Sequence, residues 1–411
     1  MRVLYLHPNA WTGEHVILAE WMRQGHEVCV LEEKRNLGET RILADHFRSP
    51  GDGIATLWYD PRRGAEKVLT WPVDRWFKKD FDGRNFAHRM WMIRAAVRKF
   101  QPDAVIASEG FSYGIPAAAL KRFGYLRQPL ITSFIGGDIL DCPEAAVGKR
   151  RVGGTGKLIR EALEYPEVLR AVSPLINEAL LAEGADPARI RIIPSHLTWA
   201  DEARDELMAN RGAIRSEIRR RYRIDSAAPL IVTLGGNQLG KGLQLLLSAW
   251  PRVLQTIPGA RWLLCGPRDP WYIDEIEPKL ASFSGSIVAS GPLTGPSVFE
   301  HLAAADLHVN PSLCESLNMV TVEAASAGTP TITSDGAGIA YWVSRHDAGM
   351  VVPNRRVPEL ADAIIIALQS PDLLNKWAIS CESLVSQFKV ERVARMLIDC
   401  VANLTGKSSP N

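Results

Sequence analysis

Apolar residues occur in short uninterrupted runs, and each run is followed by a loop and then by a segment with helical spacing. Residues 3–6 form the first run, and residues 14–24 have helical spacing that ends at Gly25. The next predicted strand is 26–31, which is apolar from Val28 to Leu31. Runs that are apolar throughout are typical of parallel strands buried on both faces, and a glycine commonly ends a helix. The N-terminal pattern therefore predicts a βαβ unit.

The same pattern recurs over most of the chain. Further strands are predicted at residues 104–107, 130–134, 170–174, 190–194, 230–234, 261–266, 286–293 and 307–309. Alternating strands and helices are typical of α/β folds with parallel sheets. We therefore predict a doubly wound N-terminal domain over 1–198, a second such domain over 199–385, and a helical tail over 386–411.

Composition narrows the class of protein. The chain has 411 residues, 46% of them hydrophobic and 23% charged, which predicts a soluble protein with more than one core. A formal charge of +2 argues against a nucleic-acid-binding protein. The six cysteines are scattered without a Cys-x-x-Cys pair, which predicts reduced thiols in a cytoplasmic protein. No signal peptide is recognisable, and no apolar run approaches the ~18 residues of a membrane span.

The segment from Asn310 to Pro330 combines a strand end, a tight turn and a short helix. Glu315 precedes the first turn of that helix and Glu323 lies on it. The first N–H groups of a helix lack intrahelical partners and favour anions, so this helix start predicts a diphosphate site. The two carboxylates would then accept hydroxyl groups of a sugar or ribose, unless they are simply solvated charges.

Seven residues separate these two glutamates within Pro-Ser-Leu-Cys-Glu-Ser-Leu-Asn-Met-Val-Thr-Val-Glu-Ala-Ala-Ser-Ala-Gly-Thr-Pro. This order resembles the signature of glycosyltransferase family 4, retaining nucleotide-sugar transferases of the GT-B fold. The resemblance implies two Rossmann-like domains facing a cleft, with the donor on the C-terminal domain and the acceptor mainly on the other. It also implies that the tail over 386–411 returns to the first domain. It also implies that Glu323 binds the ribose and that Glu315 lies beside the donor sugar. Further donor-binding residues are predicted at Ser316, Leu317, Asn318 and Met319, and at Leu293 beside the base.

Residues 235–241 fit the phosphate-loop pattern G-x-x-x-x-G-K, but Gly242 replaces the Ser or Thr that would hold magnesium. A nucleoside triphosphatase is therefore not predicted, whereas Lys241 remains a suitable point charge for a diphosphate. The resembling family usually has an arginine about five residues before this lysine. Gly236 and Asn237 occupy that region here. Either another cation such as Arg268 takes the place of that arginine, or the negative charge of the diphosphate is neutralised less completely.

In the N-terminal half, the resemblance places Gly13 beside the donor diphosphate. Glu109 and Asp138 follow two predicted strands, at the edge where open α/β sheets bind ligands. The family commonly has histidines at these two strand ends. Because this sequence lacks those histidines, the acceptor chemistry stays open. Glu109 and Asp138 are predicted catalytic residues, together with Lys241 and Glu315. His196 is predicted to be a structural histidine at the hinge between the domains.

Aromatic and basic residues interleave over residues 71–100, where a helix forms toward the end of the segment. Three interpretations stay open: a helix packed on the sheet, a wall of the acceptor pocket, and a peripheral membrane contact. Asp80-Phe81-Asp82 has no third ligand, so no metal site is predicted there. A second basic cluster is predicted to be a solvated helix face; its members are Arg215, Arg219, Arg220, Arg221 and Arg223.

These observations predict transfer of a hexosyl group from a nucleoside-diphosphate sugar to a hydroxyl acceptor, with retention and without metal or cofactor. No carboxylate stands out as a nucleophile, which favours a front-face mechanism in which the leaving phosphate takes the acceptor's proton. Two alternatives are a nucleotide-sugar epimerase and a non-catalytic sugar-nucleotide-binding protein. The sequence does not select the donor base, the sugar, the acceptor or the oligomeric state.

Overall fold

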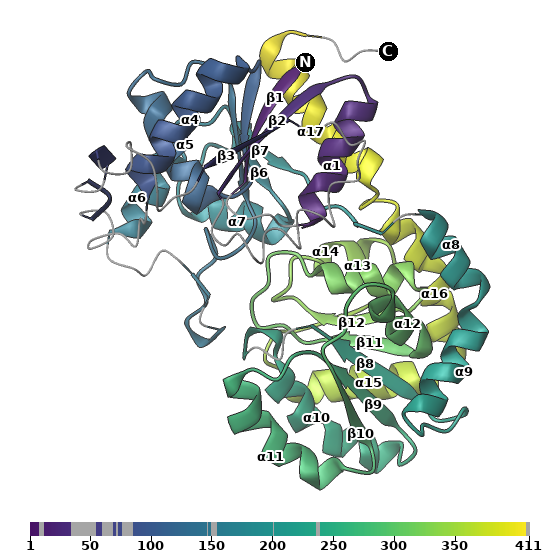
Figure 1. Ribbon diagram of the computed structural model, residues 1–411. Helices are drawn as coiled ribbons and strands as arrows, with labels where there is room; N and C mark the ends of the chain where they lie inside the picture. The colour runs from purple at the N-terminus through teal and green to yellow at the C-terminus, as the bar shows by residue number, and fades with distance from the viewer. Residues whose placement is uncertain are drawn as a thin grey trace. The chain divides into compact units, whose positions relative to one another are not determined.

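The computed structural model describes residues 1–7, 12–33, 55–59, 69–70, 73–75, 85–145, 147–148, 154–199, 201–235 and 239–407. Contacts divide the chain into two compact units. Unit 1 comprises 1–141, 148–198 and 389–411, and unit 2 comprises 142–147 and 199–388. Each unit is an α/β structure in which helices surround a parallel sheet (Figure 1).

The sheet of unit 1 has seven strands in the order β3-β2-β1-β4-β5-β6-β7. Every adjacent pair is parallel. The strands are β1 (Arg2–His7), β2 (Glu27–Glu33), β3 (Ala55–Tyr59), β4 (Ala104–Ala107), β5 (Leu130–Phe134), β6 (Val168–Ala171) and β7 (Ile190–Ile192). The α-helices are α1 (Thr12–Arg23), α4 (Phe86–Phe100), α5 (Ile115–Arg122), α6 (Thr155–Ala162), α7 (Pro174–Ala182) and α17 (Val390–Thr405).

The sheet of unit 2 has six parallel strands in the order β10-β9-β8-β11-β12-β13. They are β8 (Leu230–Leu234), β9 (Arg261–Cys265), β10 (Ile287–Gly291), β11 (Leu307–Asn310), β12 (Thr331–Ser334) and β13 (Gly349–Val352). The α-helices are α8 (Asp201–Ala209), α9 (Arg211–Arg221), α10 (Leu243–Thr256), α11 (Glu277–Leu280), α12 (Pro296–Ala304), α13 (Met319–Ser326), α14 (Ala340–Arg345), α15 (Val357–Gln369) and α16 (Pro371–Val385).

Both sheets run outward in two directions from a central pair of strands, β1 and β4 in unit 1 and β8 and β11 in unit 2. In such doubly wound sheets the connections diverge at this pair, which opens a crevice at the carboxyl ends of the strands. The loops after these four strands are therefore where each unit can hold a ligand.

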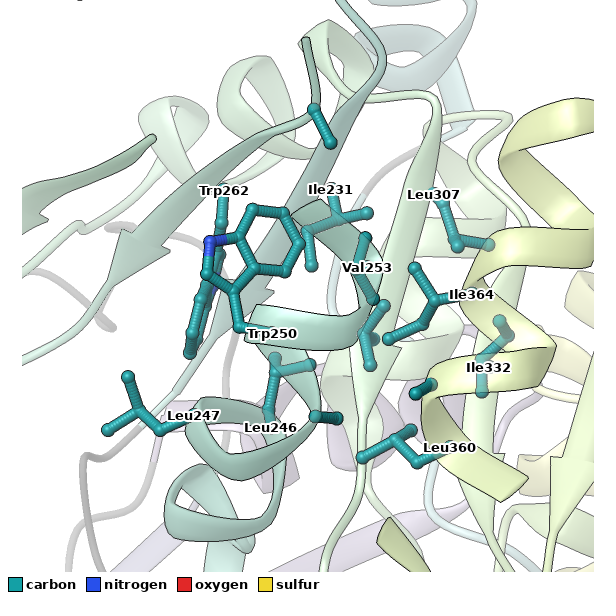
Figure 2. Close-up of a cluster of buried hydrophobic side chains, with 14 of the residues drawn as sticks. Ile231, Leu246, Leu247, Trp250, Val253, Trp262, Leu307, Ile332, Leu360 and Ile364 are labelled. Atoms are coloured by element: carbon teal, nitrogen blue, oxygen red, sulfur yellow. The ribbon is translucent and has the colours of Figure 1, made fainter. Parts of the chain in front are cut away.

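The core of unit 2 packs α10 and α15 against the sheet. Trp250 on α10 and Trp262 on β9 meet edge to face, with ring centroids 5.6 Å apart (Figure 2). Each buried indole keeps a hydrogen bond, because Trp250 Nε1 donates to Ser286 and Trp262 Nε1 donates to Thr233. Buried tryptophans of this kind stabilise a core without leaving a polar group unsatisfied.

The core of unit 1 includes the end of the chain. Helix α17 packs beside α1, and the two helices share one apolar cluster with β1 (Figure 1). Trp21 on α1 is fully buried there, and its Nε1 donates to the carbonyl oxygen of Ala394 at 2.9 Å. The residues that follow unit 2 in sequence thus complete the core of unit 1.

Several boundaries differ from the predicted ones. Strand β6 begins two residues earlier than its apolar run, and α10 continues through Pro251 to Thr256. The sequence pattern missed β3, β12 and β13, each of which is only four or five residues long and depends on pairing with its neighbours. The basic aromatic segment does become helical, as α4. None of the six cysteines forms a disulfide.

Among the helices of the residues described above, none is both long and apolar enough to cross a bilayer.

Candidate functional site

A lysine and a glutamate from two different loops form an ion pair at the central strands of unit 2. Lys241 follows β8 and Glu315 follows β11. The ammonium Nζ of Lys241 lies 2.5 Å and 2.6 Å from the two carboxylate oxygens of Glu315. Both side chains are only partly exposed, at 25% and 20%. A pair shielded to this degree interacts more strongly than one at the surface.

The loop that carries Lys241 is held by close backbone packing against the loop after β11. Gly242 has φ +69°, and a Cβ at this position would lie 1.9 Å from the carbonyl oxygen of Pro311. The amide of Leu313 donates to the carbonyl oxygen of Gly240 at 2.8 Å. Any side chain at position 242 would push the two loops apart, so glycine here is required to bring Lys241 to Glu315.

Glu315 is anchored through both its backbone and its carboxylate. Its N–H donates to the carbonyl oxygen of Gly336, and its own carbonyl accepts from Gly338, each at 2.9 Å. Ser312 Oγ and Asn318 Nδ2 both donate to Oε2, each at 3.0 Å. With Lys241 on both oxygens, this carboxylate is oriented by three side chains.

Asn318 also starts helix α13. Its side chain accepts from the amide of Thr321 at 3.1 Å, and its left-handed backbone, at φ 78°, turns the chain into the helix. The first N–H groups of a helix lack intrahelical acceptors, so those of Met319 and Val320 remain for a ligand. An ideal Cβ at Gly235 would lie 3.8 Å from Lys241 Cε and 4.0 Å from Val320 Cγ2, so lysine and helix start flank the same position.

Glu323 is the second carboxylate of this region. It lies on α13, on a different face of the helix from Asn318, and it is partly buried. Burial raises the pKa of Glu323 to about 7, and the charge of Lys241 opposes that rise. A carboxyl group that titrates near neutral pH can accept hydrogen bonds from hydroxyl groups once it is ionised.

His308 underlies the same site and was not singled out from the sequence. It is buried on β11, with Nδ1 3.2 Å from Thr331 Oγ1. Burial, together with the charge of Lys241, lowers the pKa of His308 to about 3. The imidazole therefore stays neutral and adds no positive charge beside Lys241.

Arg268 and Leu293, two other predicted donor-binding residues, have their recorded contacts with other parts of unit 2. Arg268 is exposed and pairs with the carboxylate of Glu277, so its charge is already compensated. Leu293 follows β10 and packs against the apolar cluster beside α12. Gly236 and Asn237 lie outside the described residues, as does the Asp80–Asp82 triplet.

Glu109 and Asp138 form a pair of carboxylates in unit 1, after β4 and β5. Glu109 accepts from the amides of Phe111 and Tyr113, and Asp138 accepts from the amides of Gly110 and Gly136. Burial, followed by the charge of Asp138, raises the pKa of Glu109 to about 7. Burial also raises the pKa of Asp138, against the donation from these amides. The two predicted residues thus interact, and backbone groups hold both.

Gly13 lies in the first turn of α1, and a buried polar network supports it. The Nε2 of His196 lies 2.7 Å from the carbonyl oxygen of Gly13, which only accepts, so Nε2 carries the proton. The adjacent Glu14 is buried and accepts from the hydroxyl of Tyr5. Burial lowers the pKa of His196, partly offset by Glu14. His196 therefore serves unit 1 as a neutral structural residue that fixes the start of α1.

Ser312 is a second site residue that the sequence analysis passed over. It stands three residues before Glu315, in the Asn-Pro-Ser that ends β11, and its hydroxyl is completely buried between Asn310 and Glu315. The one feature of the sequence that could have indicated its role is that it lies only three residues before Glu315. Only the turn of the loop shows that the hydroxyl reaches the carboxylate.

The predicted solvated arginine face is wrong for two of its five members. Arg219 is 2% exposed, and both Arg219 and Arg215 pair with Asp306. Arg219 also donates to four backbone carbonyls, which is why its charge is tolerated inside the fold. Arg220 and Arg221 do lie at the surface, where Glu217 pairs with both.

In the part of the chain that the structure describes, no three His, Cys, Asp or Glu side chains are grouped as metal ligands usually are.

Two family models match the chain. The model described as "Glycosyl transferase 4-like domain" matches residues 15–196, and the model described as "Glycosyl transferases group 1" matches residues 228–370. The first range contains Glu109 and Asp138, and the second contains Lys241, Glu315 and Glu323.

Similar curated proteins include named glycosyltransferases. The chain is 28% identical over 270 residues to a GDP-mannose-dependent alpha-(1-6)-phosphatidylinositol monomannoside mannosyltransferase of Mycobacterium tuberculosis, covering 62% of this chain and 64% of the relative. It is 27% identical over 224 residues to a D-inositol 3-phosphate glycosyltransferase of Rhodococcus erythropolis, covering 53% and 49%. The chain thus spans less than two thirds of the length of either relative.

Similar solved structures cover nearly the whole chain. Anabaena HepE in complex with UDP has a TM-score of 0.73 at 15% identity, with 98% of this chain and 100% of that chain covered. WaaG, a glycosyltransferase involved in lipopolysaccharide biosynthesis, has a TM-score of 0.65 at 16% identity, with 97% and 99% covered. At these identities the likeness concerns the fold, which is that of GT-B glycosyltransferases.

Proposed function

Because the chain belongs to the GT-B glycosyltransferases of the GT4 type, we propose that it transfers a hexosyl group from a nucleoside-diphosphate sugar to a hydroxyl acceptor, with retention. The observation that carries the proposal is the pairing of Lys241 with Glu315 at the start of α13. A single ammonium group and free helix amides at the carboxyl edge of a doubly wound sheet suit a diphosphate.

In the proposed reaction the donor diphosphate takes the place of Glu315 as the main partner of Lys241. Negative charge grows on this diphosphate as the bond to the sugar breaks. The ammonium and the amides of Met319 and Val320 are positioned in advance to stabilise that charge. We propose that this neutralisation needs no metal ion.

Released from Lys241, Glu315 keeps its hydrogen bonds from Ser312 and Asn318. We propose that it orients the donor sugar through hydroxyl groups rather than attacking the anomeric carbon. A double displacement would need a carboxylate free to form a covalent bond to that carbon, whereas this one is fixed by its neighbours. The proposal is therefore a front-face mechanism, in which the leaving phosphate oxygen accepts the proton of the acceptor hydroxyl.

Glu323 is the proposed ligand of the ribose hydroxyls. Its position on α13, beyond the helix start, matches a nucleoside that extends from a diphosphate held by the first turn. We propose that unit 1 binds the acceptor, with Glu109 and Asp138 close to its hydroxyl groups.

The test is incubation of the purified protein with nucleotide sugars, including GDP-mannose and UDP-glucose, with and without an acceptor panel. Transfer that survives EDTA, gives a product of unchanged anomeric configuration by NMR, and disappears in Glu315→Ala supports the proposal. Conversion of the donor sugar without any acceptor would identify an epimerase. Nucleotide binding by calorimetry without turnover on any acceptor would identify a non-catalytic binding protein.

The membrane contact left open by the sequence has a definable surface on unit 1. Trp91 on α4 is 48% exposed, and Arg94 on the same helix stacks on Tyr125, which is 57% exposed. We propose that this surface touches anionic lipid. Co-sedimentation with phosphatidylglycerol vesicles should fall in Trp91→Ala but persist in Ile379→Ala, an exposed apolar change in unit 2. Equal sedimentation of both variants would reject the contact.

A further inference from the structure

Unit 2 contains a polar cavity at the edge of its sheet opposite to Lys241 and Glu315. Lys241 and Glu315 follow the carboxyl ends of β8 and β11, whereas this cavity lies where the chain enters β8, β11 and β12. Its volume is about 480 Å³, within the range of roughly 300–1,000 Å³ typical of small-molecule sites. Its lining includes Arg211, Arg215, Asp306, Leu374 and Asn375.

Positive charge in this cavity exceeds the negative charge that is available to compensate it. Asp306 is the acidic residue of the lining, and it already pairs with Arg215 at 2.6 Å and with Arg219 at 3.0 Å. Arg211 adds a third guanidinium, and no carboxylate of the described residues lies within ion-pair distance of it. The lining thus holds two guanidinium groups and one carboxylate, and the buried Arg219 pairs with that same carboxylate, so positive charge is in excess.

Arg211 also has unused hydrogen-bonding capacity. Its Nε donates to the carbonyl oxygen of Ala303 at 3.4 Å and its Nη2 donates to Thr329 Oγ1 at 3.3 Å, both long bonds. A guanidinium has five N–H groups in a planar fork, so most of those of Arg211 have no strong acceptor. Burial and then the charge of Arg215 lower the pKa of Arg211, which is the sign expected for a cation held without its counter-ion.

We propose that this cavity binds the phosphate group of a small phosphate monoester, with Arg211 as its main ligand and Arg215 beside it. A phosphate monoester carries about −1.5 to −2 charge at pH 7 on three acceptor oxygens, which complements the excess of positive charge and the largely unused guanidinium fork of Arg211. The remaining lining is largely alkyl, from Leu368, Pro371, Leu374 and Ala378, with the amide of Asn375 at the rim. It suits a compact organic body attached to the phosphate.

Strand β11 and helix α13 each run between the neighbourhood of this cavity and the proposed donor site. Asp306 immediately precedes β11, which leads to Glu315, and Arg211 binds Thr329 just beyond the end of α13, whose start flanks Lys241. Neither Arg211 nor Arg215 belongs to the proposed transfer site, so binding here can be measured independently of transfer.

The experiment is calorimetric titration of glucose 6-phosphate into the full-length Lys241→Ala protein, which keeps this cavity and removes the main cation of the donor site. We expect saturable binding that free glucose does not show. Arg211→Gln in the same background should weaken it by about tenfold or more, because a charge-assisted fork is lost. Arg220→Gln, a change on the exposed face of the same helix, should leave it unchanged.

Asn375→Trp tests the cavity without touching an arginine. Asn375 is exposed on α16, so an indole there can block the mouth without disturbing the core. Loss of binding in both Arg211→Gln and Asn375→Trp supports the proposal. It would be overturned by absence of binding, by binding that both variants retain, or by succinate binding as tightly as the phosphate ester, which would assign the cavity to a different anion.

Discussion

The two units have the same order of strands about their central pair but compensate their carboxylates in different ways. In unit 2, the carboxylate after β11 is paired with the ammonium of Lys241. In unit 1, the carboxylates after β4 and β5 are held by backbone N–H groups, with Glu109 on two amides and Asp138 on others. The same fold therefore presents two electrostatic arrangements at equivalent edges.

The two arrangements differ in whether the group that compensates the carboxylate can move when a ligand binds. A lysine on a flexible side chain can leave a carboxylate for an incoming diphosphate, whereas backbone amides are fixed by the turn that contains them. Unit 2 can thus offer charge to a ligand, while the carboxyl groups of unit 1 respond by titrating. The pKa of about 7 for Glu109 reflects this second case.

The largest effect is expected from Lys241→Ala, which removes the cation on which the comparison rests. Transfer should fall by about 10³-fold, the scale of losing a main electrostatic contact in the transition state. Steady-state kinetics with the best donor measures it, and thermal unfolding confirms that the fold remains. Lys279→Ala is the matched control, because that lysine is exposed and paired only with Glu275. Equal activity in the two variants would contradict the role of Lys241.

Gly242→Ala should separate Lys241 from Glu315 without changing either. The new Cβ would sit 1.9 Å from the carbonyl oxygen of Pro311, at φ +69°. We expect a loss of about 3 kcal/mol in the free energy of unfolding together with a sharp loss of donor affinity. Denaturant unfolding and donor titration measure both. Gly259→Ala, where the Cβ meets no atom within 4 Å, should change neither, and a similar result for both glycines would be evidence against the packing argument.

Glu323→Gln should weaken donor binding by about 30-fold, since a charged hydrogen-bond partner contributes roughly 2 kcal/mol. The pKa of about 7 adds a pH dependence. Ribose hydroxyls favour the ionised carboxylate, so binding releases a proton and wild-type affinity rises with pH up to about 7. Calorimetry from pH 5.5 to 8 should show this rise for the wild type and not for Glu323→Gln. A rise of equal size in the variant would exclude Glu323 as its source.

The smallest effect concerns unit 1. The folded-state pKa of Glu109, about 7, lies above its ordinary value of 4.5. The folded protein therefore binds more protons between these values, and the associated stability is present below pH 4.5 and lost as the pH rises through 7. From pH 5 to 8, the wild type should lose about 2 kcal/mol more than Glu109→Gln.

Urea unfolding at several pH values measures this difference. Glu178→Gln is the control, because Glu178 is an exposed carboxylate on α7. If the stability profiles of the wild type and Glu109→Gln run parallel, the buried carboxyl of unit 1 does not titrate in this range.

The alternation of apolar runs and helical segments was enough to predict two parallel α/β sheets. The reason is that strands buried on both faces must be apolar throughout, wherever they lie in the sheet. Strand β3 was missed, and its pairing with β2 is a tertiary fact that the short sequence Ala-Thr-Leu-Trp-Tyr does not indicate. The strands β12 and β13, at four residues each, were missed for the same reason.

For the candidate site, the motif pointed to Glu315, Glu323 and Lys241, which the fold does gather around the start of α13. Arg268 was one possible substitute for the arginine that is missing before Lys241, and the fold pairs it with Glu277. The arginines of α9 likewise have partners that the sequence did not predict. Their sequence is that of a solvated face, yet Arg219 is buried because Asp306 and four carbonyl groups happen to surround it.

What the sequence determined by itself was the class of fold, the order of its repeating units and the residue types that can bind a nucleotide sugar, because periodicity and local motifs are written along the chain. Only the tertiary structure decided the partners: that Gly242 packs on Pro311, that Ser312 reaches Glu315, and that Arg211 has no carboxylate among the described residues. Partners distant in sequence meet through the packing of loops and helices, and their distances set which charges are compensated and which pKa values shift.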